Sequence, residues 1–153
     1  MRATRCRGDA GQVGGIEALP FGLLVFVVGS LLIANAWAVV DAKFATEAAA
    51  RQAVRTFVEG SDERTAHDDA VVAGLAAIEG HGRNPERARV APVGTVSLTR
   101  CTRVTFEAEY EVPALSLPFI GGYGTAPFRV RSTHTELVDP YRSGVPGSVA
   151  ACP

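Results

Sequence analysis

The longest apolar segment of the chain lies near its N-terminus. No charged residue occurs from Ala18 to Val40, a run of 23 positions, and a helix needs about 20 apolar residues to cross the hydrocarbon core of a bilayer. Pro20 falls in the first turn, where its missing N–H costs little. Trp37 falls near the far end, where aromatic residues mark membrane interfaces. The pattern predicts a leader over residues 1–17 and a transmembrane helix over residues 18–40.

The charges on either side of this segment predict its orientation. The leader contains Arg2, Arg5 and Arg7 against the two acids Asp9 and Glu17, whereas the charges that follow the segment balance. Cytoplasmic flanks carry an excess of Lys and Arg. We therefore expect a single-pass protein of the cytoplasmic membrane, with a cytoplasmic N-terminus and an extracytoplasmic module over residues 41–153.

A secretory signal peptide is the alternative interpretation of the apolar segment. The tripeptides Ala34-Asn35-Ala36 and Ala36-Trp37-Ala38 match the small-x-small cleavage pattern. However, the apolar run exceeds the core of about 7–15 residues that is usual for a signal, and the helical pattern continues through the cleavage site. These features favour a permanent anchor.

The helical pattern extends beyond the anchor over about residues 41–59. This stretch is rich in alanine, the strongest helix former. Ala50, Val54, Phe57 and Val58 recur at helical spacing and predict its buried face. Gly60 then ends the helix.

A second, shorter helix is expected over about residues 66–79. Thr65 and Asp68 have the spacing of a capping box at its N-terminus. Val71, Leu75 and Ile78 predict its buried stripe.

The remainder of the chain predicts strands, because apolar and polar residues alternate with a period of two. The expected strands cover about residues 93–98, 103–112 and 128–138. If the two longer strands pair, an acidic row that includes Glu109 and Glu111 faces Arg129 and Arg131, and each such pair contributes about 0.2–1 kcal/mol. So small a sheet must pack on the helices, which makes the fold class α+β.

The connection between the two longer strands is unusually apolar for a loop. It carries Leu115, Leu117, Phe119 and Ile120 and no charge. Two interpretations remain open. The segment folds back over the core, or it contacts a membrane or a partner subunit, as exposed apolar patches commonly do.

The three cysteines fall on different sides of the predicted membrane. Cys6 lies in the leader, where the cytoplasm keeps thiols reduced. Cys101 and Cys152 lie on the exported side, where disulfides persist. A bridge between them would tie the C-terminus to the sheet, so we expect it, with two unpaired thiols as the alternative.

No residue pattern in the chain predicts catalysis. The net charge of −1 argues against nucleic-acid binding. The run His67-Asp68-Asp69 is more typical of a solvated helix start than of a metal site, and the motifs of phosphate loops and nucleophile elbows do not occur. We therefore expect no enzyme activity, cofactor, metal or small-molecule substrate.

Two stretches resemble a known family. The first is "GQVGGIEALPFGLL", from Gly11 to Leu24, which combines a short leader ending in glycine with an acid and an apolar helix, and the second is "STHTELVDPYRSG", from Ser132 to Gly144. With the overall layout, the first stretch resembles the type IV pilin-like N-terminus of the TadE-like pseudopilins of tight-adherence pilus assembly. The second resembles the end of TadE-like domains.

The resemblance implies a mechanism for the N-terminus. A prepilin peptidase would cut after Gly11 and leave Gln12 as the first residue, and Glu17 would attract the terminal amine of a neighbouring subunit during assembly. The family usually has this Glu at mature position five, whereas here it is the sixth residue, so an unprocessed membrane protein is the alternative. The implied partners are the membrane, other pilus-assembly proteins or pilins, and a prepilin peptidase.

Two functions follow from these observations. The first is a membrane-anchored minor pseudopilin or assembly protein of a surface pilus. The second is a membrane-tethered binding or scaffold module that is not linked to pili.

Overall fold

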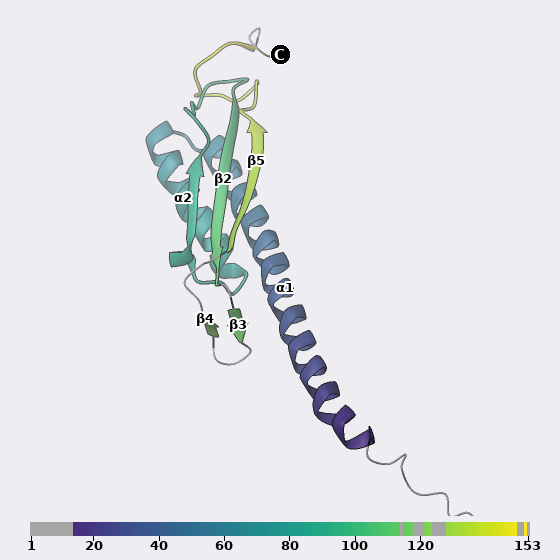
Figure 1. Ribbon diagram of the computed structural model, residues 1–153. Helices are drawn as coiled ribbons and strands as arrows, with labels where there is room; N and C mark the ends of the chain where they lie inside the picture. The colour runs from purple at the N-terminus through teal and green to yellow at the C-terminus, as the bar shows by residue number, and fades with distance from the viewer. Residues whose placement is uncertain (1–13, 114, 118–120, 124–127, 150–151, 153) are drawn as a thin grey trace, which may run out of the picture.

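The computed structural model (Figure 1) describes residues 14–113, 115–117, 121–123, 128–149 and 152. The helical elements are α1 (Gly14–Glu59), α2 (Glu63–Gly80) and the single 3₁₀ turn η1 (Pro85–Arg87). The strands are β1 (Ala88–Pro92), β2 (Arg103–Val112), β3 (Leu115–Leu117), β4 (Gly121–Tyr123) and β5 (Phe128–Leu137). The predicted α+β fold is confirmed, with two helices packed on a three-stranded antiparallel sheet.

Helix α1 is one continuous helix of 46 residues, and it has two different halves. Its first half is apolar and projects away from the rest of the protein (Figure 1). Among the described residues this is the one helix long and apolar enough to cross a membrane, by length and composition, and its most apolar window has no buried residue. The second half lies against α2 and the sheet and ends at Glu59, as predicted, before Gly60.

Small residues bring α1 and α2 close together. The fully buried alanines of α1 are Ala42, Ala45, Ala49, Ala50 and Ala53, and the buried line of α2 is Ala66, Ala70, Gly74 and Ile78. A Cβ atom on Gly74 would lie 2.9 Å from a Val90 methyl and 3.3 Å from the Ala49 carbonyl oxygen. The predicted stripe of α2 was therefore wrong in part: Val71 and Leu75 are only half-buried, because the smaller residues occupy the line of closest approach.

The N-terminus of α2 also differs from the prediction. The helix begins at Glu63 rather than near residue 66, and its N-cap is Asp62 rather than Thr65. The Asp62 carboxylate accepts hydrogen bonds from the Thr65 N–H at 3.1 Å and from the Thr65 hydroxyl at 3.0 Å. These bonds favour the ionised carboxylate and lower the pKa of Asp62 from its ordinary value.

The three-stranded sheet has the order β1-β2-β5. The apolar face of β2, from Val104 to Val112, is buried against the helices as predicted. On the opposite face, Glu109 is paired in register with Arg131 and lies 3.0 Å from its Nε atom. Arg129 contacts the carboxylates of Glu109 and Glu111 at 3.4 and 3.3 Å. The predicted cross-strand charge pairs are therefore confirmed, and β5 ends at Leu137, one residue before the predicted end.

The strand predicted over residues 93–98 is wrong, because the first strand is β1, Ala88–Pro92. Gly94 adopts a φ of +76°, which takes the chain out of the extended conformation. Further along, the Leu98 N–H donates to the Glu63 carboxylate at 3.1 Å instead of joining a strand ladder. Residues 93–98 therefore form a bend and an irregular segment that reaches α2.

The apolar connection between β2 and β5 contains the hairpin β3–β4. Leu115 and Leu117 lie in β3, where the backbone alone is described, and Phe119 and Ile120 lie outside the described residues. The hairpin lies beyond the end of the three-stranded sheet, and β3 packs beside α1 (Figure 1). Its position is therefore toward the apolar half of the long helix.

The structure joins Cys101 to Cys152 in a disulfide, with Cα atoms 4.8 Å apart. Cys101 has a φ of +64° and its N–H donates to the Val138 carbonyl at 3.0 Å, just beyond the end of β5. The bridge thus ties the C-terminal segment to the end of the sheet that lies far from the apolar helix (Figure 1). Cys6 lies outside the described residues.

Candidate functional site at the junction of the long helix and the sheet

The apolar half of α1 passes into its buried half at residues 38–46, and polar contacts fix the helix there from two sides. Arg83, which follows α2, makes the first set. Its Nε and one terminal nitrogen donate to a single Asp41 carboxylate oxygen at 3.0 and 2.6 Å, and the same terminal nitrogen donates to the Ala38 carbonyl at 2.8 Å. The guanidinium carbon also lies 5.2 Å from the ring centre of Tyr110 on β2. One arginine therefore links α2, α1 and the sheet.

The burial of this contact makes it stronger than a surface ion pair. The Arg83 side chain is 14% exposed, and that of Asp41 is 43% exposed. Exposed pairs contribute about 0–1 kcal/mol, whereas charge-assisted hydrogen bonds in shielded places are roughly twice as strong as neutral ones. Placing a cation over an aromatic face adds a further attraction.

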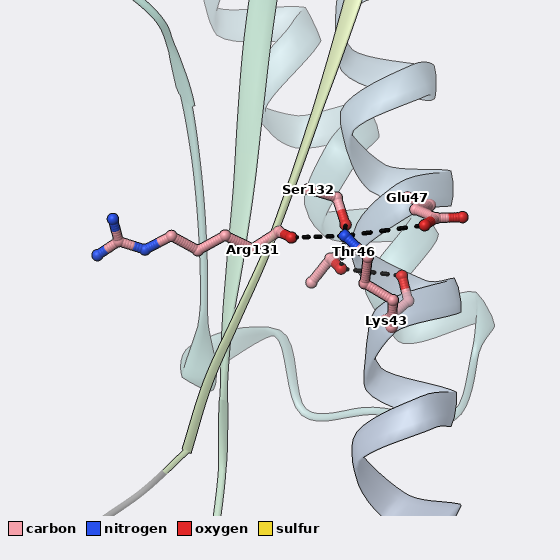
Figure 2. Close-up of polar contacts among 5 residues, drawn as sticks. All are labelled: Lys43, Thr46, Glu47, Arg131 and Ser132. Atoms are coloured by element: carbon pink, nitrogen blue, oxygen red, sulfur yellow. Dashed lines mark hydrogen bonds and ion pairs between the residues drawn. The ribbon is translucent and has the colours of Figure 1, made fainter.

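The second set of contacts joins α1 to the edge strand β5 (Figure 2). The Lys43 ammonium donates to the main-chain oxygen of Arg131 at 2.7 Å and to the Ser132 hydroxyl at 2.9 Å. The Glu47 carboxylate forms an ion pair with the same ammonium at 3.8 Å. Figure 2 shows the Arg131 side chain pointing away from α1, so that only its main-chain oxygen takes part.

A closed ring of hydrogen bonds completes this second set. The Thr46 hydroxyl donates to the Lys43 carbonyl at 2.9 Å. Because that uses its single proton, the Ser132 hydroxyl is the donor in the 2.8 Å bond between the two hydroxyls. Thr46 is fully buried and Ser132 is 5% exposed, so each hydroxyl is satisfied without water.

This geometry favours a positioning role over catalysis. In serine–lysine hydrolases the lysine is the base that activates the serine. Here the Lys43 ammonium donates to two oxygen acceptors and lies near the Glu47 carboxylate, and the Ser132 proton is directed at Thr46. Ser132 is also only 5% exposed, although it lines a pocket of about 450 Å³ together with Lys43 and Glu47. The ring instead holds β5 against the helix where the apolar segment ends.

A third contact holds the far end of α1. Arg142, in the segment after β5, donates to the carbonyl oxygens of Val58, Glu59 and Gly60, the latter two at 2.6 Å each. These carbonyls lie at the C-terminal end of α1, where the helix dipole favours a cation. The buried half of the helix is thus fixed at both ends.

The residues expected to act at the N-terminus lie apart from this junction. Glu17 lies in the first turn of α1, where the backbone alone is described, and Gly11 and Gln12 lie outside the described residues. Glu17 is separated from Asp41 by about 36 Å along the helix axis, at 1.5 Å per residue. The structure therefore does not bring the predicted assembly residue and the junction together.

Near the start of α2, His67 is half-buried and the neighbouring acids Asp68 and Asp69 are exposed. His67 Nδ1 lies 3.4 Å from an Asp68 carboxylate oxygen, and the Asp68 side chain is 78% exposed. Over the part of the chain that the structure describes, no three His, Cys, Asp or Glu side chains gather in a way that could hold a metal ion.

Sequence reasoning missed the residues of the junction. Arg83 stands in a polar turn with nothing local to mark it, and Thr46 and Ser132 are isolated polar residues on otherwise buried faces. Two signals were available: Lys43 is the single lysine of the chain, and Arg142 lies in the C-terminal stretch quoted above.

Comparison of the chain with protein-family models, curated proteins and solved structures found no match.

Proposed function

We propose that this chain is a membrane-anchored TadE-like protein that acts as a minor pseudopilin or assembly factor of a tight-adherence pilus. The proposal starts from the two sequence stretches that resemble that family. The observation that carries it further is helix α1, whose apolar, unburied half continues without a break into a half that is buried under the sheet. A subunit that stacks by its apolar helix needs this division of one helix into two surfaces.

The junction supports retention of the apolar half over removal as a signal peptide. Cleavage after Ala36 or Ala38 would cut α1 beside the Ala38 carbonyl and Asp41, which Arg83 binds. Signal peptidase acts before the exported part folds, so the product would lack only the apolar half. However, the turn of α1 that Arg83 binds would then be the free N-terminal end of the helix, where helices fray.

The N-terminal mass of membrane-purified protein tests this proposal. A chain that begins at Gln12 indicates prepilin peptidase processing, and a chain that begins at Met1 indicates an unprocessed assembly factor. A chain that begins at Trp37 or Val39 would show that the segment was a signal peptide and would refute both forms of the proposal.

The substitution Glu17→Gln tests the assembly mechanism. A charge in hydrocarbon costs a few kcal/mol on insertion scales, so its retention suggests a partner charge, such as the N-terminal amine of a neighbour. We expect the variant to insert normally, because a neutral residue enters the bilayer more easily, but to lose co-purification with pilus proteins. The packing control is Ile16→Val. Assembly of Glu17→Gln at the wild-type level would show that the carboxylate has no role in subunit pairing.

A further inference from the structure

An apolar groove lies where the module approaches the apolar half of α1. Its volume is about 440 Å³, and its lining includes Leu31, Leu32, Asn35 and Val39 of α1 together with Phe128, the first residue of β5. Leu32 is 66% exposed and Phe128 is 59% exposed. The hairpin β3–β4 lies on the same side of the protein, with β3 beside α1 (Figure 1).

The position of the groove along α1 sets its depth in a membrane. All of its α1 residues belong to the uncharged run of residues 18–40. Leu32 lies about 12 Å along the helix axis from Val40, the last residue of that run. A span of about 20 residues that starts at Ala18 ends at Trp37, so the groove straddles the extracytoplasmic interface of the bilayer.

The chemistry of the groove identifies its occupant. Its lining is aliphatic and aromatic except for Asn35, whose side-chain amide donates to the Leu31 carbonyl at 2.7 Å. If water filled the groove, the apolar side chains of Leu32 and Phe128 would stay exposed to it. An acyl chain of the surrounding leaflet would lie at the same depth as this stretch of α1 and could cover both side chains. The open edges of the hairpin β3–β4 cannot enter the hydrocarbon core unpaired, which places the hairpin among the headgroups.

We propose that this groove holds an acyl chain of an extracytoplasmic-leaflet lipid, and that Phe128 and the hairpin β3–β4 seat the base of the module in the membrane interface. The inference rests on the proposed membrane anchoring. It adds a second membrane contact. Because the module is held rigidly on α1, this contact fixes the tilt and rotation of the whole protein relative to the bilayer, which a single helix would leave free.

Fluorescence quenching by brominated lipids tests the inference, because the chain has one tryptophan. The full chain is reconstituted at low protein-to-lipid ratio in phosphatidylcholine–phosphatidylglycerol vesicles, with bromine either near the headgroup end or near the methyl end of the acyl chains. Three single-tryptophan proteins are compared: the wild type with Trp37, and the variants Phe128→Trp and Tyr141→Trp, each made in a Trp37→Phe background. Tyr141 is 83% exposed and lies near the far end of α1, next to Arg142.

We expect the tryptophan at position 128 to lose a share of its emission comparable to that lost by Trp37, more strongly with bromine near the headgroups, and the tryptophan at position 141 to lose none. Quenching of Trp37 with an unquenched position 128 would overturn the lipid contact while leaving the anchor intact. Absence of quenching at both positions would overturn the membrane anchoring itself. Far-UV circular dichroism checks the fold, and the exposure of Phe128 leaves room for the larger ring.

If the groove instead held the helix of a second copy, dilution would separate the two cases. A second copy in the groove would shield position 128 from the brominated lipid, and this shielding would decrease as the protein is diluted into lipid. Quenching at position 128 that appears only on dilution would therefore show that a second copy displaces the lipid at higher protein density. Position 128 that stays unquenched at every dilution would exclude the acyl chain.

Discussion

The contact of Arg83 with α1 gives the sharpest test of how the module is held on its helix. The substitution Arg83→Met keeps most of the aliphatic stem and removes all donors. It breaks the two bonds to Asp41 and the one to the Ala38 carbonyl, and it removes the cation from the face of Tyr110. Asp41 remains as a carboxylate that is 43% exposed, so water can solvate it.

The loss of unfolding free energy that we expect for Arg83→Met lies between two limits. An exposed ion pair contributes about 0–1 kcal/mol, and removal of one partner of a fully buried pair costs about 3–5 kcal/mol. Because Arg83 is 14% exposed and its partner is open to water, we expect a loss of about 2–3 kcal/mol in the free energy of unfolding, of which the cation–π contact supplies about 0.5–1 kcal/mol. Asp41→Asn keeps an acceptor and should cost less, about 1 kcal/mol.

The measurement is a double-mutant cycle on the full chain in nonionic detergent. Urea-induced unfolding is followed by near-ultraviolet circular dichroism, which reports the packing around tyrosines such as Tyr110. We expect a coupling energy between Arg83 and Asp41 of about 1–2 kcal/mol. Arg87→Met is the matched control: this arginine is exposed and lies four positions along the chain, so its change should stay within about 0.5 kcal/mol.

A coupling energy below about 0.5 kcal/mol would refute the reasoning. The pair would then behave as an exposed one, and the junction would rest on apolar packing alone. An equal loss of unfolding free energy in Arg87→Met would also refute the reasoning, because the loss in Arg83→Met would then come from the change in net charge and not from the contact with α1.

Three other changes test separate contacts. Lys43→Met should lower the free energy of unfolding by about 1–2 kcal/mol, and an unchanged urea midpoint would show that its ring of hydrogen bonds is dispensable. Asp62→Ala should lower the midpoint at neutral pH. Because the folded pKa of Asp62 is depressed, this stabilisation is present above its unfolded pKa and is lost as pH falls through the folded pKa, so a difference from wild type that grows in acid would contradict the capping role. Cys101 and Cys152, separated by 51 positions, should resist alkylation without reductant, and Cys152→Ser should cost up to about 4 kcal/mol in the chain-entropy model.

The elements that could be predicted from the sequence are those with a strong local period. Strand β2 alternates without exception from Arg103 to Val112, and the structure gives it the predicted bounds. Its pairing with β5 agrees with the predicted charge complementarity, because the antiparallel register sets Glu109 against Arg131 and Glu111 against Arg129. The long helix was predictable from its uncharged run and its alanine-rich continuation, because neither contains a helix breaker beyond the first turns.

The errors arose where small residues set the packing. The alanines of α1 predict helix formation and nothing more from the sequence alone. In the structure these alanines and Gly74 of α2 are sites of close approach, where a Cβ on Gly74 would meet Val90 of β1 and the Ala49 carbonyl of α1. Strand β1 was missed because it is short and contains Arg89 and Pro92, which are tolerated at the edge of a sheet.

The pairings at the junction could not have been predicted from the sequence, because the partners are distant in the chain. Arg83 and Asp41 are 42 positions apart, and Lys43 and Ser132 are 89 apart. No periodicity connects such pairs. Their chemistry is visible only after α2 and β5 have been placed on α1 by apolar burial.

The arrangement of these contacts also bears on the choice between the two proposed functions. A tethered binding module gains reach from a flexible linker between anchor and domain. Here the apolar half of α1 continues into the buried half without a break, and Arg83 and Lys43 hold the helix to α2 and to β5 within two turns of the end of the uncharged run. Force or rotation applied to the apolar half is therefore transmitted to the sheet, and the orientation of the module is set by that of its anchor. A subunit that must stack by its helix while presenting one face of its module needs this coupling. A tether has no use for it, so the rigid junction favours assembly.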